Sequence, residues 1–130
     1  MDLKKLASAL IPDTDLIEPE KYEEIFPPRT VPQGAEVTRL APSPTGFIHL
    51  GNLYSALADE RAAHTTGGVF YLRIEDTDEK RKVDGAVESV IRSLKYFGIN
   101  FDEGAEMQSP LNNYGPYYQR QRAKIYRAFD

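Results

Sequence analysis

The chain has 130 residues, of which 41% are hydrophobic, and 16 Lys or Arg against 20 Asp or Glu give it a net charge of −4. This is the composition of one ordinary globular domain, and the absence of cysteine excludes disulfide scaffolds, thiolate metal sites and cysteine nucleophiles. The sequence has no apolar run near the roughly 20 residues of a membrane span and no secretory signal, so we expect a soluble cytoplasmic protein without membrane contact.

Residues 1–34 differ in composition from the rest of the chain. They hold five of the nine prolines, one of the nine glycines, and seven acidic against four basic residues. Helical spacing of apolar residues predicts one short helix, on Leu3, Leu6, Ala7 and Leu10. The prolines at 27, 28 and 32 predict an extended path after it. We therefore predict an N-terminal extension over 1–34 and a compact domain over 35–130.

The compact domain begins with a strand, a loop and a helix. A strand is predicted over 37–41, because β-prone residues there run up to Pro42, which cannot donate to a sheet. A rigid proline-rich loop follows. The helix is predicted from Leu50 to Thr66, before Gly67, by apolar residues at helical spacing, namely Leu50, Leu53, Tyr54, Leu57 and Ala58.

A second strand and helix repeat this order. The apolar run over 69–74 predicts a strand buried on both faces, and an apolar stripe from Val83 to Leu94 predicts a helix that ends at Gly98. Residues 104–116 are expected to be loop, and 117–129 a helix with a basic face. Strand, helix, strand, helix predicts an α/β fold with parallel strands and a right-handed crossover. Two strands are few for such a sheet, so we expect a piece of a longer protein.

The segment from Arg39 to Asn52 carries the strongest chemical signal. It lies beyond the carboxyl end of a predicted strand and at the start of the following helix, where open α/β sheets bind ligands. Gly46 permits a tight turn, and Gly51 lets a flat ring or a phosphate approach the helix start, which favours anions. His49 can donate to a phosphate oxygen whose charge grows in a transition state. A lone histidine there would more often be a cap or a core residue.

The motifs in this segment resemble a known family. "APSPTG" at 41–46, followed by "HLGN" at 49–52, is similar to the "HIGH" signature of class I aminoacyl-tRNA synthetases, in the form that glutamyl-tRNA synthetases use. "LRIEDTD" at 72–78, "FGINFDEG" at 97–104 and "GPYYQRQRAKIY" at 115–126 match the same family. The resemblance covers about 36–128 and implies the N-terminal half of a Rossmann-like nucleotide-binding domain. The long extension, Asn52 in place of the last histidine, and Arg120 in place of a serine depart from the family pattern.

The resemblance implies roles for particular residues. Arg39 would hold the side-chain carboxylate of the substrate glutamate, Ala41 and Ser43 would contact the amino acid, and Glu75 would bind its α-ammonium group. Neighbouring parallel strands lie about 5 Å apart, so Arg39 and Glu75 should meet at one edge of the sheet, although they could simply pair with each other. The resemblance also implies an ATP site in which His49 and Asn52 are the catalytic residues. This site would be formed by Pro44, Thr45, Gly46, His49, Gly51 and Asn52.

Other charged residues receive more ordinary interpretations. Asp76 and Asp78 have a spacing that suits a metal, but we favour Thr77 or Asp78 as the cap of a helix starting near Lys80, and predict no metal site. His64 falls late in a helix, where a cation suits the helix dipole, and is given no catalytic role. The basic residues 80–82 and 120–127 are solvated faces or contacts to RNA phosphates.

The resemblance implies ATP-dependent ligation of L-glutamate to tRNA(Glu) through a glutamyl-adenylate, with Mg²⁺ accompanying the ATP phosphates. The lysine-rich "KMSKS"-like loop, the second half of the sheet and an anticodon-binding domain are not in these residues. We therefore expect the chain alone to be inactive and to self-associate through uncovered apolar surface. Two alternatives stay open: a paralogue that glutamylates a modified tRNA base, and a non-catalytic nucleotide-binding or interaction module of the same fold.

Overall fold

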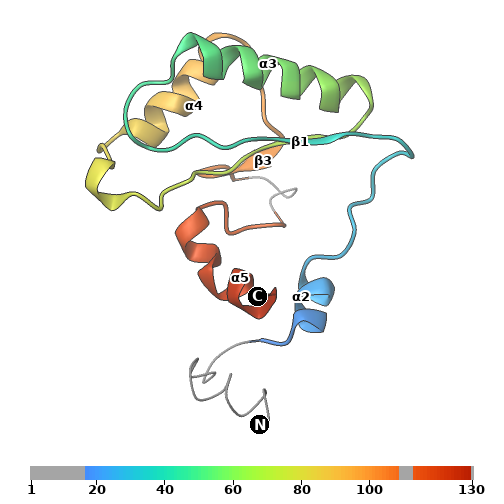
Figure 1. Ribbon diagram of the computed structural model, residues 1–130. Helices are drawn as coiled ribbons and strands as arrows, with labels where there is room; N and C mark the ends of the chain where they lie inside the picture. The colour runs from blue at the N-terminus through green and yellow to red at the C-terminus, as the bar shows by residue number, and fades with distance from the viewer. Residues whose placement is uncertain (1–16, 109–112, 130) are drawn as a thin grey trace. The chain divides into compact units, whose positions relative to one another are not determined.

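The computed structural model describes residues 17–108 and 113–129 (Figure 1). The chain divides into two compact units, of which the larger spans Pro28–Arg122 and the smaller combines the residues up to Pro27 with those from Ala123 onward. The helix predicted on residues 3–10 lies outside the described residues. None of the described helices has the length and apolar character needed to cross a bilayer.

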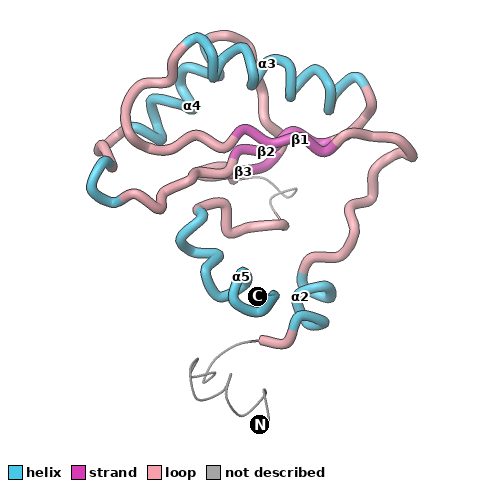
Figure 2. The backbone as a smooth tube through the Cα atoms, in the orientation of Figure 1, coloured by secondary structure: helices cyan, strands magenta, loops and turns pink. Residues whose placement is uncertain are grey.

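The larger unit contains a parallel three-stranded sheet in the order β1-β2-β3, drawn in magenta in Figure 2. Strand β1 (Val37–Leu40) pairs with β2 (Val69–Leu72), and β2 pairs with β3 (Glu103–Gly104). The parallel pair and the α/β class are confirmed. The prediction that residue 104 belongs to a loop is wrong, because Gly104 pairs with Leu72 in β3.

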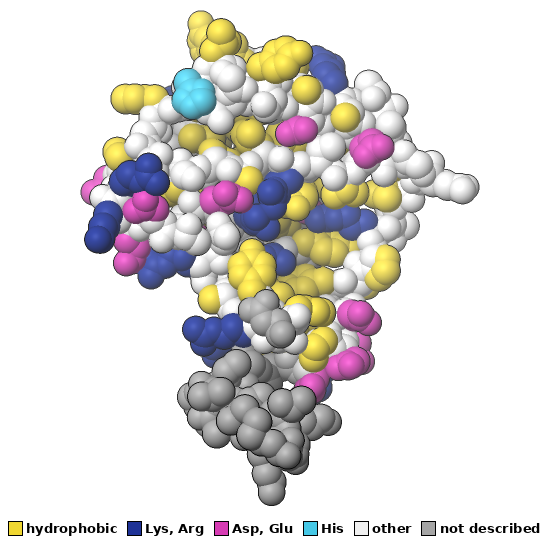
Figure 3. All heavy atoms as spheres, viewed as in Figure 1, with side chains coloured by type: hydrophobic (Ala, Val, Ile, Leu, Met, Phe, Trp, Pro, Cys, Tyr) yellow, Lys and Arg dark blue, Asp and Glu magenta, His cyan; other side chains and the backbone are white. Residues whose placement is uncertain are grey.

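Two helices cover one face of this sheet, as Figure 1 shows. They are α3 (Leu50–Thr65) and α4 (Ala86–Tyr96). The core between helices and sheet is built from small, branched and aromatic apolar side chains, among them Leu40, Ala56, Ala63, Phe70, Leu72, Val90 and Leu94. The helix predicted from Leu50 is confirmed, but its predicted apolar stripe faces this core in part, through Leu53. Leu50 and Tyr54 are 81% and 74% exposed, whereas the buried residues of α3 are Ala56, Glu60 and Ala63. Apolar side chains accordingly show on the surface at the top of Figure 3, where α3 lies.

The second helix begins later than predicted. Val83 lies before α4 and its N–H donates to the carbonyl of Pro44 at 2.9 Å. Gly85 takes the position before the helix with a φ of +76°, a conformation that favours glycine. The predicted cap at Asp78 exists, but it caps a separate 3₁₀ turn, η1 (Glu79–Arg81), and not α4.

The helix predicted over 117–129 is wrong in its first part. Tyr118 forms a parallel bridge with Ile74, whose N–H donates to the carbonyl of Tyr117 at 2.8 Å. The helical residues that follow divide into a 3₁₀ turn, η2 (Gln119–Arg122), and α5 (Ala123–Phe129). The segment at 117–118 is extended because it continues the sheet's hydrogen bonding beyond β2.

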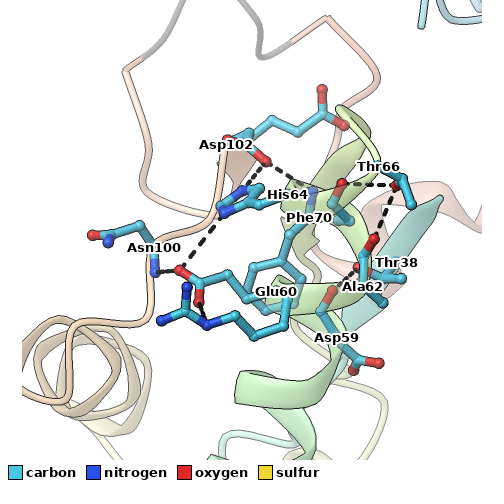
Figure 4. A network of polar contacts seen from close by, with 12 residues as sticks. Thr38, Asp59, Glu60, Ala62, His64, Thr66, Phe70, Asn100 and Asp102 are labelled. Atoms are coloured by element: carbon cyan, nitrogen blue, oxygen red, sulfur yellow. Dashed lines mark hydrogen bonds and ion pairs between the residues drawn. The ribbon is translucent and has the colours of Figure 1, made fainter. Parts of the chain in front are cut away.

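A polar network fixes the C-terminal half of α3 against the sheet (Figure 4). Asp102 accepts a hydrogen bond from the backbone N–H of Phe70 at 2.8 Å, and the same carboxylate oxygen lies 2.9 Å from Nε2 of His64. Glu60, which is buried, accepts from the backbone N–H of Asn100 at 2.8 Å. His64 therefore has a structural role at the C-terminal end of α3, whereas the predicted site lies at its N-terminal end.

The smaller unit brings two helices together. In α2 (Pro19–Ile25), which the sequence did not predict, Tyr22 is buried. Its ring lies 6.1 Å from that of Phe129 in α5 and stacks on Phe26 at 6.3 Å. Pro19 stands in the first turn of α2, where proline is tolerated, and these aromatic contacts pack the helix against its neighbours. The boundary that we predict at residue 34 remains a prediction about domain organisation.

Candidate active site

The loop that leaves β1 is tied to the segment that leaves β2. The carbonyl of Leu40 accepts from the N–H of Arg73, and that of Pro42 accepts from the N–H of Glu75, both at 3.0 Å. These bonds continue the parallel pairing past the ends of both strands, although Pro42 itself has no N–H to donate. The loop is therefore held in place on the sheet before it reaches α3.

A cleft of about 430 Å³ opens where this loop meets the start of α3. Six of the predicted site residues line it, namely Ala41, Ser43, Thr45, Gly46, His49 and Asn52. Val90 of α4 closes one side, which the sequence did not predict. Polar loop atoms, an imidazole and an amide therefore gather at the N-terminus of a 16-residue helix, where unpaired N–H groups favour an anion.

His49 occupies the predicted position directly before α3. It is the N-cap residue, its side chain makes no capping hydrogen bond, and it is exposed to the cleft. Its ring lies over Gly51, because a Cβ built at Gly51 would be 3.6 Å from Nδ1 of His49. The imidazole is thus available to a ligand rather than used as a helix cap, and the adjacent helix surface carries no side chain.

Arg39 and Glu75 meet at one edge of the sheet, as expected for neighbouring parallel strands. Nη2 of Arg39 lies 4.0 Å from Oε1 of Glu75, and both side chains are about one-third exposed, at 37% and 35%. Glu75 has a closer partner in Arg73, at 3.2 Å, while the side chain of Arg39 donates no hydrogen bond to any of the described residues. The guanidinium of Arg39 therefore keeps its donors for a further carboxylate.

The other predicted site residues lie outside the 430 Å³ cleft. Arg39 and Glu75 do not line it, and neither does Gly51. Pro44 lines a smaller neighbouring cavity of about 200 Å³ together with Asp76. The structure thus presents a polar cleft on one side of the loop and a charged pair at the strand ends.

The two aspartates of "EDTD" are used within the chain. Asp76 accepts from the backbone N–H of Arg120 at 2.9 Å. Asp78 accepts from the N–H of Arg81 at 3.3 Å and lies 2.6 Å from its Nε, and this hydrogen bonding lowers the pKa of Asp78. Among the described residues no three His, Asp or Glu side chains come together as a metal site would require.

The basic face predicted over 120–127 is partly engaged in the same way. Arg120 forms an ion pair with Glu79, and Nη1 of Arg122 donates to the carbonyls of Tyr114 and Pro116, each at 3.0 Å. These arginines hold the segment before α5 in place, so any contact of that face with RNA stays a prediction.

Comparison with known proteins identifies the family. The model of the catalytic domain of class I tRNA synthetases (E and Q) matches residues 36–129, which include the cleft, the strand edge and the aspartate loop. The chain belongs to this synthetase family. The resemblance that the motifs predict is confirmed, and with it the Rossmann-like α/β fold.

Two similar curated relatives of this synthetase chain carry the same name. The glutamate–tRNA ligase of Acetivibrio thermocellus is 59% identical over 126 residues, which cover 97% of this chain and 23% of that protein. The glutamate–tRNA ligase of Clostridium perfringens is 50% identical over 130 residues, covering 99% and 24%. The chain therefore spans about a quarter of the length of the curated relatives that it matches.

Solved structures give the same family. The crystal structure of the glutamate–tRNA synthetase from Elizabethkingia anophelis has a TM-score of 0.63 and 41% identity, covering 73% of this chain and 19% of that one. A glutamate–tRNA ligase from Elizabethkingia meningosepticum, solved in complex with its amino acid, has a TM-score of 0.62 and 42% identity, covering 72% and 18%.

Proposed function

We propose that this chain forms the part of a glutamate–tRNA ligase that binds glutamate and ATP and joins them as glutamyl-adenylate. The observation that carries the proposal is the meeting of Arg39 and Glu75 at the strand ends, beside a cleft lined by His49. The name shared by relatives of up to 59% identity supports it. The activity is proposed for a full-length ligase that carries these residues, because the chain spans about a quarter of such relatives.

The charges at the strand edge suit a glutamate zwitterion. Arg39, with free donors, would bind the side-chain carboxylate, for which a guanidinium fork can form two parallel hydrogen bonds. Glu75 would bind the α-ammonium group. With both ends of the amino acid held, the α-carboxylate would extend over the loop that contains Ala41 and Ser43 toward the cleft.

The cleft would hold ATP with its phosphates near the start of α3. In the proposed reaction an oxygen of the glutamate α-carboxylate attacks the α-phosphorus, a C–O–P linkage forms, and the bond to pyrophosphate breaks. His49 would donate a hydrogen bond to the α-phosphate as negative charge grows there, and Asn52, with Pro44, Thr45, Gly46 and Gly51, would shape the nucleotide site. The ribose hydroxyl at the end of tRNA(Glu) then attacks the carbonyl carbon, and AMP leaves.

Among the described residues no three carboxylates or histidines come together, and Asp76 and Asp78 accept hydrogen bonds from Arg120 and Arg81. Mg²⁺ would therefore come with the ATP phosphates, whose charge it neutralises. We also propose that glutamate activation depends on bound tRNA and that the enzyme works in the cytoplasm, where its tRNA is charged.

The test is glutamate-dependent exchange of pyrophosphate into ATP by the full-length ligase with tRNA(Glu) present. We expect His49→Ala to lower the exchange rate by on the order of 10²–10³, as for the loss of one transition-state donor, and to change ATP binding much less. His64→Ala is the matched control, since it removes the histidine at the other end of the same helix. An ATP affinity that falls as steeply as the rate would contradict the proposed role of His49.

A further inference from the structure

Arg29 precedes the part of the chain that the family model matches, which begins at residue 36, and its side chain contacts the sheet at Glu103 of β3. Its Nη1 donates to Oε2 of Glu103 at 2.9 Å, and Nη2 pairs with the other oxygen of the same carboxylate. Glu103 in β3 is 1% exposed and Arg29 18%. The guanidinium also lies 3.8 Å from the ring centre of Tyr114 and 5.7 Å from that of Tyr71. This is a buried, forked ion pair between two aromatic rings.

The ion pair lies on the same row of the sheet as the proposed glutamate ligand. Arg39 in β1 is the register partner of Tyr71 in β2, which is the register partner of Glu103 in β3. Register partners in a parallel sheet point to the same face, with neighbouring Cβ atoms about 5 Å apart. Arg29 thus contacts two members of the row whose third member is Arg39.

A second path leads from Arg29 toward Glu75. Arg29 packs on Tyr114, whose backbone N–H donates to the hydroxyl of Tyr117 at 3.2 Å. The carbonyl of Tyr117 accepts from the N–H of Ile74, the residue directly before Glu75. Burial, first, and the nearby Glu103 carboxylate raise the pKa of Tyr117 to about 12, so Tyr117 also lies beside the carboxylate that Arg29 binds.

We propose that Arg29 is a positioning residue, through which the segment before the catalytic domain fixes the spacing of Arg39 and Glu75 for glutamate. This inference rests on the proposed function and extends it to a residue that touches no substrate. The forked geometry requires arginine, because the ammonium group of lysine cannot form two parallel bonds to one carboxylate or stack on Tyr114 in the same way.

The experiment measures Michaelis constants for glutamate and ATP in pyrophosphate exchange by the full-length ligase, with tRNA(Glu), well below the melting temperature. We expect Arg29→Lys to raise the Michaelis constant for glutamate about tenfold, because the groups that bind glutamate are slightly misplaced. The Michaelis constant for ATP should rise less than about twofold. Arg61→Ala is the control, since it removes an arginine 71% exposed and 3.8 Å from another buried carboxylate, that of Glu60. It should change neither constant.

A second variant separates positioning from folding. Arg29→Ala combined with Glu103→Gln leaves no unpaired buried charge, so it should fold and still show the raised constant for glutamate. Unchanged glutamate constants in Arg29→Lys and in the double variant, or equal rises for ATP and glutamate, would overturn the inference. A wild-type ligase without glutamate-dependent exchange would instead overturn the proposed function, which distinguishes the two failures.

Discussion

Replacing Gly51 by alanine should separate folding from catalysis. Gly51 is the second residue of α3, and the added Cβ would meet Nδ1 and Cε1 of His49 at 3.6 and 3.9 Å, which are ordinary van der Waals contacts. Alanine is favoured over glycine by 0.8–1.0 kcal/mol inside a helix, and we expect about half of this in the first turn. The melting temperature should therefore rise by about 2 °C.

The same methyl group would occupy the helix surface over which the nucleotide is proposed to lie. We expect adenylation in the full-length ligase to fall by on the order of 10², because a displacement of about 1 Å at the reacting centre can cost that much. Thermal unfolding of the 130-residue chain and glutamate-dependent pyrophosphate exchange by the full-length ligase give the two readouts. Full activity in Gly51→Ala, or a lower melting temperature, would refute the reasoning.

Three further predictions concern the chain's stability and association. Gly68→Ala should cost about 3 kcal/mol or more in urea denaturation, because its Cβ would lie 1.8 Å from the carbonyl oxygen of Glu36, and wild-type stability would contradict the β1–β2 contact. The free energy of unfolding should fall as pH rises from about 10 to 12, because the folded state keeps Tyr117 protonated up to about 12. Tyr117→Phe should flatten this pH dependence, and a fall of equal size in the variant would show that another group causes it. The isolated 130 residues should charge no tRNA and should self-associate in sedimentation experiments through exposed Leu50 and Tyr54, whereas a charging monomer would contradict both expectations.

The sequence predicted the elements whose pattern is local. Strand β1 is marked by β-prone residues before Pro42, and α3 lies between a loop and Gly67. Because parallel strands end at one edge, the meeting of Arg39 and Glu75 followed from the order of elements alone. His49 at the helix start followed from the apolar residues at helical spacing, which begin at Leu50.

The sequence did not predict features that depend on distant residues. Strand β3 is two residues long and exists through its pairing with β2, so no periodicity marks it. Tyr118 lies in an apparently helical stretch but bridges to Ile74. Arg29 and Glu103 are 74 positions apart, and nothing in either segment shows that they pair. The predicted apolar stripe on α3 is wrong at Leu50 and Tyr54 for a related reason, since helical spacing does not tell which side chains another element covers.

We propose that the strand edge with Arg39 and Glu75 binds glutamate. Arg39→Ala in the full-length ligase removes a charge-assisted hydrogen bond worth about 1.5–3 kcal/mol. We therefore expect kcat/KM for glutamate to fall roughly 10- to 100-fold, with the Michaelis constant for ATP nearly unchanged. An unchanged kcat/KM for glutamate, or an equal loss for ATP, would show that the amino acid binds elsewhere.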